Sequence, residues 1–85
     1  MNKHSYASGD WVTYEDGSVE MINTDIRFGD TYYIDYNNRL DSFKDIDNWI
    51  EHMERKTWWT IKLRSDMVKV MIHSLEIRKK VNYQL

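Results

Sequence analysis

The sequence predicts an α+β domain, a three-stranded antiparallel β-meander with a helix packed on one face and a C-terminal helix. Two observations predict this fold. Apolar residues alternate with period two before residue 37, and they recur at helical spacing from residue 43 onward. The length of 85 residues suits one domain, and the twelve aromatic side chains can supply the core that so small a domain needs.

The polar segment 1–9 is predicted to be a flexible arm of the single domain 1–85. The segment 11–22 alternates around Asp16-Gly17, the residue pair that a type I′ hairpin turn prefers. A two-residue loop at this point determines which side chains face the core, and it places Trp11 on the opposite face. The predicted core face consists of Val12, Tyr14, Val19 and Met21.

A third strand is predicted over residues 31–36, which are rich in aromatic and β-branched side chains. Ser42 is a suitable N-cap for a helix over 43–55, and Asp45 follows three residues later as a weaker form of the capping box. The apolar residues of this helix recur three and four apart, and they are Phe43, Ile46, Trp49, Ile50 and Met53.

Thr60 can cap a second helix that extends to about Lys80. The alternative is a β-hairpin of 58–63 with 67–72, because the second of these segments alternates. On the helix, the apolar arc covers roughly 200°, about twice the width that one contact with the rest of a domain requires. The excess predicts a second apolar contact, with either a second copy of the chain in a homodimer or a target. The residues of this partner face are Val68, Ile72 and Leu75.

Charge is divided unevenly along the chain. Residues 1–54 hold twelve acidic and four basic side chains, a net charge of −8, whereas residues 55–85 hold eight basic and two acidic ones, a net charge of +6. Such asymmetry indicates either a charged partner or two halves that pair with each other within the fold.

Several function classes are excluded or disfavoured. The chain has no cysteine, which removes disulfide frameworks, thiol catalysis and thiolate metal sites. The three histidines lack metal-ligand spacing, and the acids Asp41, Asp45 and Asp47 lack the glycine and final glutamate of a calcium loop, so no metal and no other cofactor is predicted. No serine lies in a nucleophile elbow, and we predict no catalytic residue and no enzyme activity. Without a membrane span or a secretory signal, a cytoplasmic protein is expected.

Two opposite binding modes follow from the charges. The acidic half can occupy a protein groove that is built for phosphates, and its candidate residues are Glu15, Asp16, Glu20, Asp35, Asp47, Glu51 and Glu54. The basic half can follow a nucleic-acid backbone, and its candidate residues are Lys62, Arg64, Lys69, Arg78, Lys79 and Lys80. The sequence pI of about 5.8 argues against the second mode.

Three segments within residues 10–55 follow one another: the Asp-Gly hairpin 14–19, the strand 32–36 and the acidic helix 42–49. This layout resembles that of small anti-defence proteins of phages and mobile elements, anti-CRISPR proteins above all. The resemblance is architectural and does not extend to segment 60–81. It implies a stoichiometric inhibitor of a bacterial nuclease or its guide complex, acting in the host cytoplasm if the chain is phage-encoded, and it transfers no catalytic residue.

The sequence therefore predicts a non-catalytic protein-binding module, a small phage-type inhibitor of a bacterial nucleic-acid-processing complex of the CRISPR–Cas kind. The alternative is a small DNA- or RNA-binding regulator that acts through the basic C-terminal helix.

Overall fold

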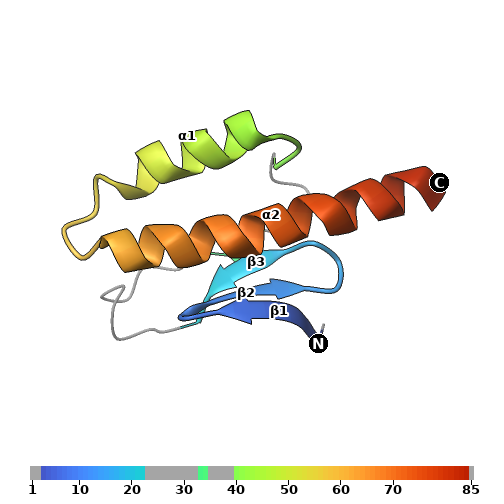
Figure 1. Ribbon diagram of the computed structural model, residues 1–85, viewed down its shortest axis with the longest axis horizontal. Coiled ribbons are helices and arrows are strands. Elements are labelled where there is room, and N and C mark those ends of the chain that lie inside the picture. The colour runs from blue at the N-terminus through green and yellow to red at the C-terminus, as the bar shows by residue number, and fades with distance from the viewer. Residues whose placement is uncertain (1–2, 23–32, 35–39, 85) are drawn as a thin grey trace.

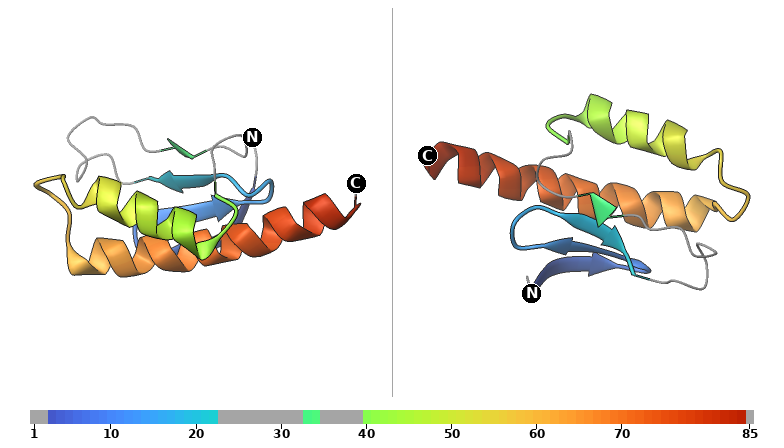
Figure 2. Two further views of the ribbon diagram at one scale, coloured as in Figure 1. Left: turned by 90° about the horizontal axis from the view of Figure 1, so that it is seen from above. Right: turned by 180° about the vertical axis from the view of Figure 1, so that it is seen from behind.

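A computed structural model of the chain describes residues 3–22, 33–34 and 40–84, and it confirms the α+β fold. Four antiparallel strands form one sheet in the order β1-β2-β3-β4, and two helices follow them in the chain. The helix α2 packs across β1, β2 and β3 on one face of the sheet, and α1 lies antiparallel beside α2 (Figures 1 and 2). The elements are β1 (His4–Ser8), β2 (Trp11–Tyr14), β3 (Val19–Met21), β4 (Tyr33–Ile34), α1 (Phe43–Met53) and α2 (Ile61–Gln84).

The first strand corrects the prediction that residues 1–9 form a flexible arm. Residues 4–8 pair with β2 as an edge strand, with Ala7 opposite Val12 and an irregularity near His4. Most of the β1 side chains are exposed, so the strand carries no apolar alternation that could reveal it in the sequence. Its order comes from the backbone ladder with β2 and from side-chain contacts with α2.

The β2–β3 hairpin forms where it was predicted, but its register differs by one residue. The Tyr14 N–H donates to the Ser18 carbonyl at 2.8 Å, so the loop has three residues, with Gly17 at a positive φ of 90°. A shift of one residue turns a strand over. Trp11 and Thr13 therefore face the core, while Tyr14 faces the other way and its hydroxyl donates to Glu20.

The first helix begins at Phe43 as predicted and ends at Met53, two residues earlier than expected. The buried carboxylate of Asp45 accepts hydrogen bonds from the backbone N–H groups of Asp41 at 2.8 Å and Ser42 at 3.2 Å. These bonds satisfy donors that the start of a helix leaves without partners. Phe43 departs from the predicted core stripe because it is 67% exposed.

The last third of the chain is one long helix, and the β-hairpin alternative for 58–63 and 67–72 is wrong. The hydroxyl of Thr60 accepts a hydrogen bond from the Leu63 N–H at 3.1 Å, as expected of an N-cap. The wide apolar arc of α2 serves two contacts within one chain, the sheet on one side and α1 on the other. The core formed by the sheet and the two helices includes Trp11, Met21, Ile50, Met53, Met67, Val70 and Met71.

A row of polar contacts joins α2 to the sheet at every fourth residue. Asp66 accepts a hydrogen bond from the Ser8 hydroxyl at 2.9 Å, and the Val70 carbonyl accepts one from the Thr13 hydroxyl at 2.6 Å. One turn further along, the Ser74 hydroxyl donates to the Gly17 carbonyl at 2.5 Å. Residues four apart lie on one side of a helix, so this row sets the position of α2 along the strands.

Candidate interaction surface

Three of the predicted acidic residues form one exposed face of α1 and its C-cap, with Asp47 and Glu51 in the helix and Glu54 as the C-cap residue. At about 100° per residue, Asp47, Glu51 and Glu54 lie within roughly 60° of one another around the helix axis. All three side chains are exposed, and none of them forms an ion pair with a basic side chain in the described part of the chain. The buried side of α1 holds Ile46, Ile50 and Met53 against α2. Core packing therefore turns the carboxylates outward.

The other predicted acids do not belong to this face. Glu15 and Asp16 lie in the β2–β3 loop, where the Asp16 carboxylate accepts a hydrogen bond from the Ser18 N–H at 2.9 Å. Glu20 is half-buried and bonded to the Tyr14 hydroxyl. The loop and α1 lie on opposite sides of α2 (Figure 1), and Asp35 lies outside the described residues. The predicted acidic surface is thus divided into two parts.

Two of the six candidate nucleic-acid-binding residues are engaged within the fold. The Lys62 ammonium forms an ion pair with Asp66 at 2.9 Å. The Arg78 guanidinium donates to the Gly17 carbonyl at 3.2 and 3.3 Å and to the Ser74 hydroxyl at 3.1 Å. The other four are exposed, but they do not form one line, since Arg64 and Lys69 lie about 140° apart around the helix. These four are Arg64, Lys69, Lys79 and Lys80.

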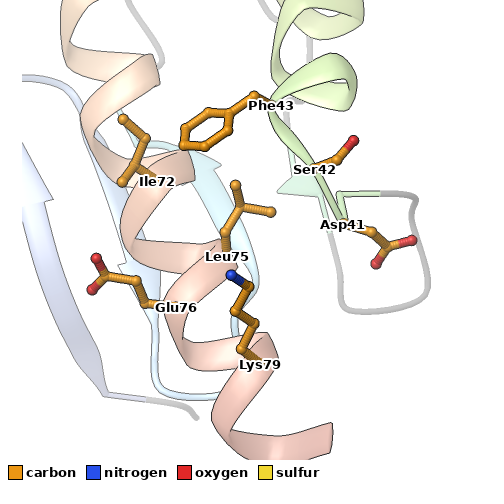
Figure 3. Close-up of a pocket in the computed structure, with 7 residues that line it drawn as sticks. All are labelled: Asp41, Ser42, Phe43, Ile72, Leu75, Glu76 and Lys79. Atoms are coloured by element: carbon orange, nitrogen blue, oxygen red, sulfur yellow. The ribbon is translucent and has the colours of Figure 1, made fainter.

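The predicted partner face of α2 is covered in part by α1. Leu75 is buried in the core, and Val68 and Ile72 are half-buried against it. A cleft of about 350 Å³ remains where the start of α1 meets the second half of α2. Figure 3 shows the Phe43 ring directed toward Ile72 and Leu75 in this cleft. Its rim carries Asp41, Ser42, Glu76 and Lys79.

Sequence reasoning missed one cluster, at the exposed edge of β1. The His73 ring stacks on Tyr6 with centroids 5.0 Å apart, and its Nε2 atom lies 3.0 Å from the Ser5 hydroxyl. A serine beside an imidazole is activated for catalysis when a third group orients the imidazole. No side chain in the described ranges bonds to Nδ1 of His73, and we interpret the cluster as a contact that holds β1 on α2. No sequence signal links residues 68 positions apart.

The fold perturbs the titration of the buried carboxylate of Asp66. The hydrogen bond from Lys62 holds the pKa of Asp66 below its ordinary value of 3.8, and the Ser8 hydroxyl adds to this effect against the opposing effect of burial. The same bond raises the pKa of Lys62 above 10.5. The Lys62 side chain is 80% exposed, so its contribution to stability is small.

Acid titration tests this assignment. A carboxyl group whose folded pKa is depressed stabilises the fold above its unfolded pKa, and that contribution is lost as the pH falls through the folded value. We therefore expect the free energy of unfolding to fall more steeply below about pH 4 in the wild type than in Asp66→Asn. Urea titrations at several pH values measure both slopes, and equal slopes would contradict the assignment. The other carboxyl groups are common to both proteins and cancel in the comparison.

No group of three or more His, Asp or Glu side chains that could hold a metal ion occurs in the described part of the chain. Neither of the helices described, at 43–53 and 61–84, is long and apolar enough to cross a membrane. Comparison with protein-family models, curated proteins and solved structures found no match for this chain.

Proposed function

We propose that the protein is a non-catalytic binding module that uses the acidic face of α1 to occupy a basic groove of a protein target. The target class that we propose is a bacterial nucleic-acid-processing complex of the CRISPR–Cas kind, which the protein inhibits at a fixed stoichiometry. The observation that carries the proposal is the exposure of Asp47, Glu51 and Glu54 on one helix face without basic partners in the described ranges.

The acidic face is comparable to a short stretch of nucleic-acid backbone in its length and in its charge. Asp47, Glu51 and Glu54 span about 10 Å at 1.5 Å per residue, which is about the length of three nucleotides of one strand at roughly 3.4 Å each. Side chains that the fold leaves unpaired remain available to complement a positive groove, which speeds the encounter and selects the partner. The acids are held on a helix whose other side is fixed in the core, so little ordering is needed on binding.

The test is an in vitro cleavage assay with purified CRISPR–Cas effector complexes of several types, in which the protein is titrated against target-DNA cleavage. We expect the wild type to inhibit at least one effector and the triple variant D47N/E51Q/E54Q to inhibit it at least tenfold more weakly, because each lost charge pair removes a favourable contact. The matched control K44Q/R55Q changes exposed bases on and beside the same helix, and it should inhibit as well as the wild type.

Two results would contradict the proposal. One is equal inhibition by the triple variant and the wild type, with both folded by circular dichroism. The other is salt-sensitive binding of mixed-sequence DNA by the protein alone, which is the signature of phosphate contacts. The second result would favour the basic-helix alternative, and it should then be abolished by reversing the exposed residues Lys69 and Lys80.

A further inference from the structure

The outer side of the two-helix layer carries apolar side chains that the fold leaves uncovered. Phe43 on α1 is 67% exposed and Ile61 on α2 is 86% exposed, while Val68 and Ile72 are half-buried. At about 100° per residue, the three α2 residues lie within roughly 40° of one another around the helix axis. We call Phe43, Ile61, Val68 and Ile72 the apolar strip. Exposed apolar side chains that are grouped in this way indicate an interaction surface.

Charges of opposite sign lie beside this strip. The outer face of α1 is acidic, with Asp47, Glu51 and Glu54 exposed. The outer side of α2 carries Lys69 and the largely exposed Lys62, whose ammonium is paired with Asp66 at 2.9 Å; the two lysines lie within about 20° of each other around the axis. One helix of the layer is thus acidic where its neighbour is basic. Such a face is complementary to the same face of a second copy when α1 of each copy lies on α2 of the other.

The acidic residues of α1 and the basic residues of α2 lie at matching heights along the axes of the two antiparallel helices. Phe43 lines the same cleft as Ile72 and Leu75, and the helices run antiparallel with equal rise per residue. Counting along both helices from this point places Asp47 level with about residue 69 and Glu54 level with about residue 62. A two-fold axis parallel to the helices preserves these levels while it places α1 of one copy over α2 of the other.

We propose that the protein forms a two-fold homodimer through this outer face, with α1 of each copy packed on α2 of the other. Phe43 of each copy, which lines the cleft of its own chain, also meets Ile72 of the other copy across the two-fold axis. Asp47 faces Lys69, and Glu54 faces the Lys62–Asp66 pair. The occupant is a second copy because the chain itself carries the required complement, a basic helix with an apolar strip at matching levels. The dimer covers acids that the proposed target would bind, so a target and the second copy exclude each other.

The first experiment measures solution mass by light scattering and sedimentation over a range of micromolar concentrations, without any target. We expect twice the chain mass of 10.4 kDa for the wild type and the monomer mass for Phe43→Ser. Phe43 is mostly exposed in the single chain, so the thermal unfolding of this variant at low concentration should match that of the wild type. A wild type that remains monomeric, or a Phe43→Ser variant that remains dimeric, would overturn the proposal.

A charge exchange tests the pairing itself. Asp47→Lys and Lys69→Asp each place like charges opposite one another, and each should weaken dimerisation at least tenfold. The double variant D47K/K69D restores opposite charges and should recover the wild-type dissociation constant to within about threefold. The control E15K/K69D has the same net charge as D47K/K69D, but its lysine is introduced in the β2–β3 loop. It should therefore dimerise as weakly as Lys69→Asp. Equal behaviour of the two double variants would rule out this interface.

The mass experiment also separates this inference from the proposed function. A monomer that still inhibits an effector through Asp47, Glu51 and Glu54 would leave the function intact and remove the dimer. A dimer that inhibits no effector would support the homodimer and contradict the proposed function.

Discussion

Replacing Trp11 with alanine is expected to cost about 3–5 kcal/mol of the free energy of unfolding, a large share of the roughly 5–15 kcal/mol that stabilises a native domain. The Trp11 side chain is completely buried in the core, and its ring meets the edge of Trp59 with centroids 6.5 Å apart. Its removal leaves a cavity between β2 and α2 that a packed interior cannot collapse fully.

Urea denaturation measures this loss as a lower transition midpoint at an unchanged slope. Two variants serve as controls. Trp11→Phe keeps most of the volume and removes a buried indole N–H that has no hydrogen-bond partner in the described part of the chain, so it should cost clearly less than Trp11→Ala. Tyr14→Ala removes a half-buried ring on the other face of β2 and should also cost less. If Tyr14→Ala were the more destabilising change, the hairpin would have the two-residue loop and the opposite face in the core.

Replacing Gly9 with alanine is the second large effect, with an expected cost of about 3 kcal/mol. Gly9 has a φ of 57°, in the left-handed region, where an L-residue costs about 1–2 kcal/mol. A Cβ atom at this position would overlap Oδ2 of Asp66 and lie 2.8 Å from its Cγ. The carboxylate would have to leave its bond to the Ser8 hydroxyl, and a hydrogen bond to a charged group contributes about 1.5–3 kcal/mol. Its contact with the exposed Lys62 ammonium adds little to this cost.

A double-mutant cycle separates the two parts of this cost. In an Asp66→Ala background the overlap is gone, so Gly9→Ala should cost only the backbone strain, about 1–2 kcal/mol. Gly17→Ala is the comparison at another left-handed glycine, because its Cβ would meet the flexible side chain of Arg78, which can move. Additive costs for Gly9→Ala and Asp66→Ala would show that the two residues are not in contact as the structure places them.

The elements that the sequence predicts correctly carry their signals within a few residues. Ser42 with Asp45 marks the start of α1, Thr60 marks the start of α2, and Asp16-Gly17 marks a turn. The acidic outer face of α1 was also predictable, since the apolar residues Ile46, Ile50 and Met53 determine which side of the helix is buried. Local hydrogen bonds and periodicity are sufficient in these cases.

Contacts between distant residues determine the features that the sequence leaves open. Asp16-Gly17 permits a hairpin loop of two or of three residues. The structure has the three-residue loop, and in that register Trp11 faces the core and contacts Trp59, which is distant in the sequence. The strand β1 depends on its pairing with β2. Arg78 is not available as an exposed base because its guanidinium donates to the Gly17 carbonyl, 61 residues away in the sequence.

Periodicity and capping residues were thus enough to predict the α+β class, both helices with their N-caps, and the outward acids of α1. The hairpin register, the additional strand β1, the burial of Leu75 beside α1 and the choice of which bases remain exposed became visible only in the folded chain. The physical reason is that periodicity and capping specify an element and its buried side, whereas register, edge pairing and side-chain partners depend on surfaces that come together only when the chain folds.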